Sequence, residues 1–154
     1  MILKIIGNLD KPLIEKAVKK TSSLIKTPKN LHIYVLENLN MCYSIKLPRN
    51  IQDKFKTACS HKVSFSFKFK NKEMILVYMD KMLVNNQDGL IGLLLHEISH
   101  MNQINKGIYK RIYEDYEKVR GRNYNLLMRL KYDKKDLVWL FHDLSVISIL
   151  TLKD

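Results

Sequence analysis

The spacing of the hydrophobic residues changes near residue 80, and this change limits the folds that the chain can adopt. Between residues 63 and 70, Val and Phe alternate with Ser and Lys, which is the period-2 pattern of a strand with one buried face. From about residue 88 onward, apolar residues recur at every third or fourth position, which is typical of helices. Mixed elements first and helices afterwards favour an α+β fold.

The first half of the chain is predicted to form a small mixed or antiparallel sheet with a helix. Asp10 is the expected cap of that helix, which has Pro12 in its first turn and ends before Pro28. A second, short helix is predicted over Ile51–Ala58. Residues Asn71-Lys72 are the expected turn of a hairpin. The predicted strands are Met1–Ile6, Leu31–Leu36, Cys42–Leu47, Val63–Lys70 and Met74–Met79.

The second half is predicted to be helical throughout. Its first helix is capped by Asp88 and followed by Gly107 as the C′ residue. Apolar periodicity predicts a second helix from Ile108 to Val119, a third around residues 126–130 and a last one from about Asp136. A length of 154 residues suits one domain, so residues 1–154 are expected to form a single unit.

The composition indicates which binding partners and which cellular compartment to expect. The net charge of +12 comes from 27 Lys and Arg against 15 Asp and Glu. Lys dominates and is spread over the whole chain, and Arg, which recognises base edges and phosphates with two parallel hydrogen bonds, is scarce, so a nucleic-acid partner is not expected. Cys42 and Cys59 have no metal-ligand spacing and are expected to be reduced. The start MILKIIG lacks the apolar core of a signal peptide, so we expect a cytoplasmic protein without a transmembrane segment.

Residues 96–100 read His-Glu-Ile-Ser-His, inside the helix predicted after Asp88. Side chains four residues apart lie one turn apart on the same helix face, so His96 and His100 can direct two imidazoles at one metal ion. Glu97 lies about 100° round the helix axis, beside the same ion but offset from its ligands. There it can accept a proton from a zinc-bound water. The pattern predicts a Zn²⁺ site with Glu97 as the general base.

This segment resembles the active-site helix of the zincin metallopeptidases. The size of the chain resembles the soluble minigluzincins, which are gluzincin-like and similar to the catalytic domains of integral-membrane metallopeptidases. The resemblance implies a sheet, a metal-binding helix and a later helix that supplies a third ligand. It places a strand, here Met74–Met79, just upstream of the metal helix, and it implies an edge strand there that pairs with the substrate backbone. The implied activity is zinc-dependent hydrolysis of a peptide or protein substrate.

The nearby candidates for a third zinc ligand are weak. The residues three and six positions after His100 are Gln103 and Lys106, whereas metzincins have Gly and His there. Gluzincins use a Glu on a later helix, and Glu114 and Glu117 are the nearby candidates. Both lie among Tyr, Lys and Arg, so they are expected on the outer face of their helix.

His142 and Asp143 interrupt the apolar last helix. Burying either side chain there is unfavourable unless a partner satisfies it. Because minigluzincins resemble gluzincins except for a His as third ligand, the resemblance makes His142 the third ligand. Asp143 is then the neighbour that orients an imidazole, or the alternative third ligand. His32 and His61 are expected to be structural or solvent-facing. A Tyr is the expected second donor to the oxyanion, and eight tyrosines leave that choice open.

Two other functions remain open at this stage. A latent or non-catalytic zincin would keep the fold and the metal while the apolar C-terminal helix fills its own cleft or mediates self-association. A basic nucleic-acid-binding protein would use zinc structurally, and its affinity would fall steeply with salt.

Overall fold

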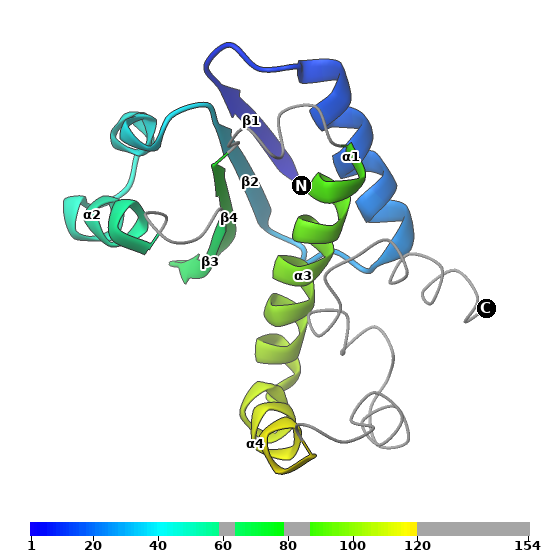
Figure 1. The fold of residues 1–154 in the computed structure, drawn as a ribbon. Coiled ribbons are helices and arrows are strands. Elements are labelled where there is room, and N and C mark those ends of the chain that lie inside the picture. Colours follow the sequence, from blue (N-terminus) through cyan, green and yellow to red (C-terminus); the bar gives the residue numbers. More distant parts are fainter. Residues whose placement is uncertain (59–63, 79–86, 120–154) are drawn as a thin grey trace.

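Four strands form one mixed sheet in the computed structural model, which describes residues 1–58, 64–78 and 87–119 (Figure 1). The strands lie in the order β1-β2-β4-β3, where β1 and β4 each pair with β2 in parallel and β3 pairs with β4 antiparallel. The strand bounds are β1 (Ile2–Ile6), β2 (Leu31–Leu36), β3 (Ser64–Phe69) and β4 (Lys72–Tyr78). Sheet and helices together confirm the predicted α+β class.

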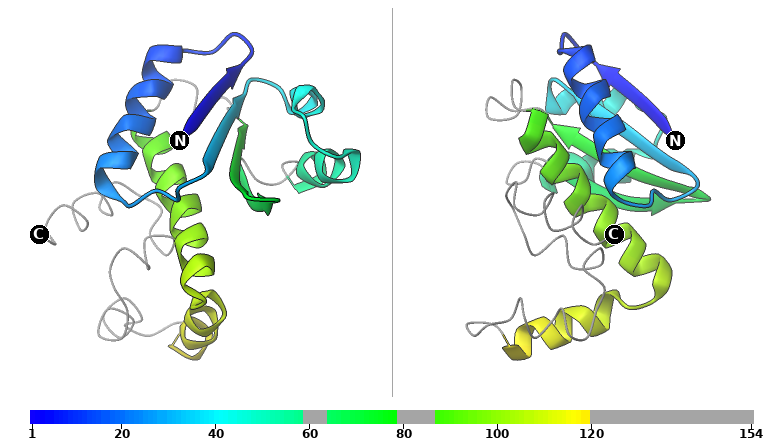
Figure 2. Two further views of the ribbon diagram at one scale, coloured as in Figure 1. Left: turned by 180° about the vertical axis from the view of Figure 1, so that it is seen from behind. Right: turned by 90° about the vertical axis from the view of Figure 1, so that its right-hand side faces the viewer.

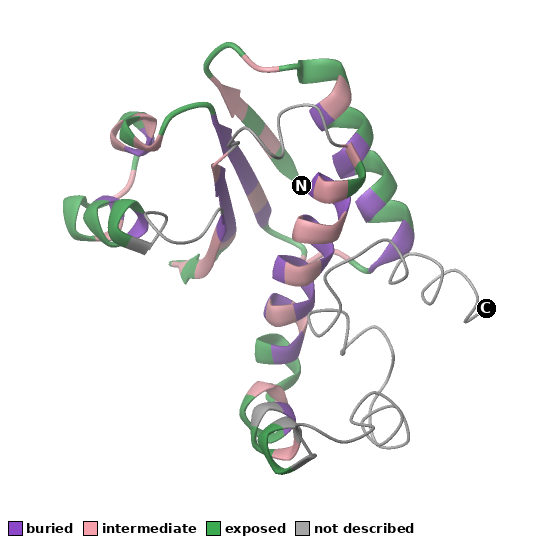
Figure 3. Cartoon of the chain, viewed as in Figure 1, coloured by how far each residue is buried: buried purple, intermediate pink, exposed green. Residues whose placement is uncertain are grey.

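Helices α1 (Lys11–Leu24) and α3 (Gln87–Lys106) cover one face of this sheet (Figures 1 and 2). The start of α1 is as predicted, because the Asp10 carboxylate accepts a hydrogen bond from the backbone N–H of Leu13 at 3.2 Å and Pro12 lies in the first turn. The sheet residues facing these helices are apolar and buried, as the purple segments of Figure 3 show. They include Leu31, Ile33, Val35, Ile75 and Val77.

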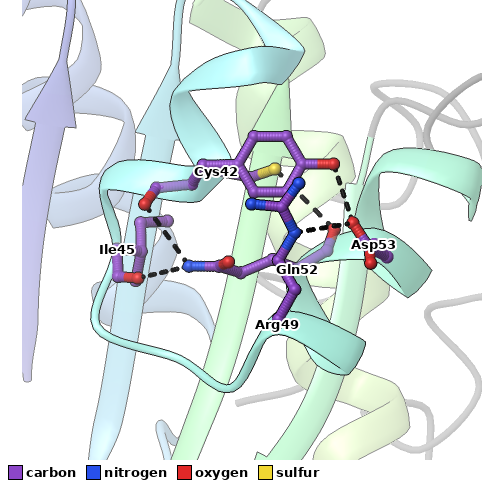
Figure 4. A network of polar contacts seen from close by, with 6 residues as sticks. Cys42, Ile45, Arg49, Gln52 and Asp53 are labelled. Carbon is purple, nitrogen blue, oxygen red and sulfur yellow. Dashed lines mark hydrogen bonds and ion pairs between the residues drawn. The ribbon is translucent and has the colours of Figure 1, made fainter.

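The opposite face of the sheet packs against α2 (Arg49–Ala58) and the short 3₁₀ helix η1 (Leu39–Ser44). The strand predicted over Cys42–Leu47 is therefore wrong, since half of that segment belongs to η1. Hydrogen bonds from a side chain explain why this segment is not a strand. The Gln52 amide donates hydrogen bonds to the backbone carbonyls of Ile45 at 2.8 Å and Tyr43 at 3.4 Å (Figure 4). Carbonyls satisfied in this way need no neighbouring strand.

A second set of contacts holds η1 against α2. Tyr43 donates a hydrogen bond to Asp53 at 2.8 Å, and the Arg49 guanidinium, which lies 4.1 Å from the centre of the Tyr43 ring, pairs with the same carboxylate (Figure 4). Cys42 is buried and not in a disulfide, and burial raises the pKa of its thiol. A buried neutral thiol of this kind packs as a small hydrophobic side chain.

Strands β3 and β4 form the predicted hairpin. Its turn is Lys70-Asn71, one residue earlier than expected, with Lys70 in the left-handed region at φ +55°. The zincin resemblance places the strand Met74–Met79 just before the metal helix, and this strand corresponds to β4. Because β4 lies between β2 and β3, it is an inner strand, and β3 is the edge strand of the hairpin. The edge strand that the resemblance implied at Met74–Met79 is therefore wrong, because β4 pairs with β2 on one side and with β3 on the other.

Helix α3 ends at a glycine and turns directly into α4 (Tyr109–Val119). Gly107 has φ +70°, its N–H donates to Ile104 and the N–H of Ile108 donates to Gln103, which is the Schellman pattern predicted by a C′ glycine. The helices predicted around residues 126–130 and from residue 136 lie outside the described residues. Within the described ranges, no helix has the length and apolar character that a membrane span requires.

Candidate metal centre

The two histidines of the HExxH motif converge on one side of α3. The apolar stripe of α3, which includes Leu94, Ile98 and Met101, packs into the core, and His96 and His100 lie half-buried beside it. Their Nε2 atoms are 3.1 Å apart, and their rings are nearly perpendicular, at 86° with centroids 4.6 Å apart. The i, i+4 spacing predicted from the sequence thus brings both imidazoles to one point.

This donor pair fits a zinc ion. Two imidazole nitrogens at about 2.0–2.1 Å from a tetrahedral zinc ion lie about 3.3–3.4 Å from each other. The distance between the Nε2 atoms of His96 and His100 is close to this separation without any rotation of either ring. Neutral imidazole is also a preferred ligand of Zn²⁺. The same distance suits an N–H···N hydrogen bond between neutral rings, so metal content is the measurement that separates the two arrangements.

Glu97 lies on the neighbouring stripe of α3 and is buried. Its residue is 7% exposed, and its Oε1 atom accepts a hydrogen bond of 2.8 Å from the hydroxyl of Ser64, which begins β3. Among the described residues, Ser64 is the side chain that donates to this carboxylate. The acid–base candidate is therefore held between the metal-site helix and the edge strand.

The face of β3 that looks toward α3 is polar. Ser64, Ser66 and Lys68 alternate with phenylalanines that pack on the other side, against the cluster containing Phe55. The phenylalanine side of β3 is thus the side away from the candidate metal centre. On the polar side, Ser64 is buried and contacts Glu97.

One tyrosine of the described residues contacts the histidine pair. The ring of Tyr109, the first residue of α4, meets the His100 ring edge-on with centroids 5.4 Å apart and an angle of 66°. The turn at Gly107 places the first residue of α4, Tyr109, beside His100. Among the tyrosines whose side chains the structure describes, Tyr109 is the one whose ring contacts this pair.

Of the other candidate ligands, the structure describes Glu114 and Glu117, and neither forms a metal-binding group with the two histidines. Glu114 and Glu117 are exposed on α4, and Glu114 pairs with Lys110 at 4.0 Å, as expected for the outer face. His142, Asp143 and His61 lie outside the described residues. Within the described part of the chain, no group of three or more His, Cys, Asp or Glu is arranged to hold a metal ion.

Comparison of the chain with protein-family models, with curated proteins and with solved structures found no match. The residues that carry the candidate chemistry are thus His96, Glu97 and His100, together with Ser64 and Tyr109. The last two were missed as site residues at the sequence level. Ser64 gave only one signal, its place on the polar side of an alternating strand, and Tyr109 gave none beyond its residue type.

Proposed function

We propose that this protein is a zinc-dependent metallopeptidase of the zincin type. The observation that carries the proposal is the convergence of the Nε2 atoms of His96 and His100 at 3.1 Å, beside a buried glutamate and under an edge strand. Two imidazoles supply part of a zinc site, and a catalytic zinc has three protein ligands and one open position. His142 is the proposed third ligand, with Asp143 as the alternative.

Glu97 is the proposed catalytic residue. A zinc ion in this site would act as a Lewis acid that makes a water molecule more acidic and polarises the scissile carbonyl. The Glu97 carboxylate then accepts the proton of the attacking water and passes it to the leaving amine. Its burial favours this role, because a hydrogen bond between the carboxylate and the attacking water is electrostatically stronger where bulk water is excluded.

The substrate of this proposal is an extended peptide that lies along β3. Among the described residues this strand pairs with β4 on one side only, so its other edge offers backbone N–H and C=O groups to a further strand. Tyr109 is the proposed second donor to the oxyanion, because it is the described tyrosine whose ring contacts His100.

The experiment is hydrolysis of labelled casein and of a fluorogenic peptide library by the zinc-loaded full chain. Glu97→Gln keeps the shape of the side chain and removes the base, so activity should fall by about 10²-fold or more. Glu114→Gln, the same change on an exposed turn of α4, is the matched control and should leave activity unchanged. Removing the metal with a chelator should abolish activity, and added zinc should restore it.

Unchanged hydrolysis by Glu97→Gln would contradict the proposal and would indicate another base or a contaminating protease. A zinc-loaded wild type without hydrolysis would instead favour the latent zincin that the sequence leaves open.

A further inference from the structure

The contact between Ser64 and Glu97 connects two elements that are far apart in the chain. The two residues are 33 positions apart, and each is 7% exposed. Ser64 begins the edge strand and is paired with Val77 of β4, while Glu97 is in the middle of α3. A buried hydrogen bond between a hydroxyl and a carboxylate is charge-assisted and therefore among the stronger kinds.

Glu97 needs such a contact because its own helix does not fix the carboxylate. A glutamate side chain has three rotatable bonds, and ordering it is entropically unfavourable. A general base must also lie within hydrogen-bond reach of the proton it accepts, and small displacements lower the rate strongly. The hydroxyl of Ser64 holds one carboxylate oxygen, Oε1, at 2.8 Å.

The neighbouring residue of β3 on the same face provides a comparison. Ser66 lies two positions along the strand, on the same polar side, and makes no hydrogen bond to Glu97. Ser64 and Ser66 thus have the same residue type and lie on the same face of the strand, but of the two, Ser64 contacts the Glu97 carboxylate.

We propose that Ser64 is a positioning residue, which holds the Glu97 carboxylate in place from the edge strand. This inference rests on the proposed function, since it assigns Glu97 the role of base. It adds that the strand along which the substrate lies also orients the group that accepts the proton. Ser64 itself exchanges no proton with the substrate.

Kinetics of the zinc-loaded full chain test the proposal, with the fluorogenic peptide that the wild type hydrolyses fastest as the probe. Ser64→Ala should lower kcat by about 10- to 100-fold with KM unchanged, because a misplaced base affects the transition state and not substrate binding. Ser64→Thr keeps the hydroxyl and should restore most of kcat. Ser44→Ala, the same change on η1 at the opposite face of the sheet, should behave as the wild type. All variants should keep the zinc content of the wild type.

Equal activity of Ser64→Ala and the wild type would overturn the proposal, and so would a Ser64→Thr variant with the full defect of Ser64→Ala. A rise in KM with kcat unchanged would also overturn it, since that pattern indicates a substrate contact.

Thermal unfolding of the metal-free protein tests the contact without requiring activity. Ser64→Ala should lower Tm by about 3–10 °C, in the range for a hydrogen bond to a charged group in a chain of this size. The same substitution in a Glu97→Ala background should change Tm little, because its partner is gone. Equal losses in both backgrounds would refute the contact. If the coupling is present and the wild type hydrolyses nothing, the proposed function fails, the role of Ser64 as the holder of a base fails with it, and only the structural contact stands.

Discussion

The described histidines have different surroundings. His96 and His100 face each other on the helix that also carries Glu97. His32 on β2 is half-buried, its Nδ1 atom has no hydrogen-bond partner among the described residues, and its charged neighbours are cations. Burial lowers the pKa of His32 most, and Lys72, the amino terminus and Lys4 lower it further. His32 is thus a structural histidine that resists protonation.

The depressed pKa of His32 predicts a pH dependence of stability. The unfolded chain protonates His32 at about pH 6.5, whereas the folded chain does so only at lower pH. Below about pH 6.5 the unfolded state therefore binds more protons, and the free energy of unfolding falls as the pH decreases.

Urea unfolding of the metal-free protein at pH 7.5 and at pH 5.5 measures this loss. Wild type should lose more stability between the two values than His32→Asn, which does not titrate. Equal losses would show that His32 has its ordinary pKa in the folded state.

At the scale of elements, local patterns predicted most of the structure. The cap at Asp10, the hairpin strand β3 and the glycine end of α3 are encoded within a few residues, and each prediction is confirmed. The predicted burial of the phenylalanine face of β3 is not, because the phenylalanines are half-buried and Ser64 is the buried residue of this strand. The same holds for the convergence of His96 and His100, because one helical turn sets it.

The features that sequence reasoning missed depend on contacts between distant segments. The segment Cys42–Leu47 has the residue types of a strand, but the Gln52 side chain donates hydrogen bonds to the backbone carbonyls of Tyr43 and Ile45. The edge position of β3 follows from the strand order of the whole sheet, which no local pattern contains. The Ser64 contact to Glu97 depends on that order in turn, since it requires β3 to lie beside α3.

Substitutions at two glycines of the α3 region, Gly107 and Gly92, should have opposite effects on stability. Gly107 has φ +70°, so Gly107→Ala should destabilise the protein by about 1–2 kcal/mol through backbone strain alone, as its Cβ would meet no described atom within 4 Å. Gly92 lies inside α3 in equally open surroundings without a positive φ. Gly92→Ala should stabilise the protein by about 0.5–1 kcal/mol.

Urea unfolding of both variants at one pH gives the comparison. A stabilising Gly107→Ala would contradict the Schellman turn and with it the placement of Tyr109 against His100. The Gly92→Ala variant serves as the control for adding a methyl group to this helix.

At the scale of the whole molecule, the site lies where one helix layer meets the edge of the sheet (Figures 1 and 2). The far end of α3 is tied to the hairpin through Glu73 of β4, whose Oε1 accepts a hydrogen bond of 2.7 Å from Asn105 and pairs with Lys68 of β3 at 3.7 Å. These contacts hold the C-terminal end of α3 against the hairpin of β3 and β4. The proposed third ligand must come to it from the chain that follows α4.

That ligand can be identified by metal affinity. If His142 binds zinc, His142→Ala leaves two ligands, and affinity should fall by far more than the 10- to 100-fold typical of residues that only orient a ligand. Asp143→Asn should give that milder loss. Competition with a chromogenic chelator measures both.

The exposed carboxylates Glu114 and Glu117 are the controls for the third ligand, and their replacement by Gln should leave zinc affinity unchanged. A severe loss in Asp143→Asn with a mild one in His142→Ala would reverse the assignment. A loss confined to Glu114→Gln or Glu117→Gln would indicate the ordinary gluzincin arrangement.

The central claim is that His96 and His100 hold a zinc ion while Glu97 does not. The most direct measurement is the zinc content of the purified full chain by inductively coupled plasma mass spectrometry. The wild type and Glu97→Gln should each contain about one zinc per chain, and His96→Ala and His100→Ala should contain almost none. Full zinc content in both histidine variants would contradict the claim.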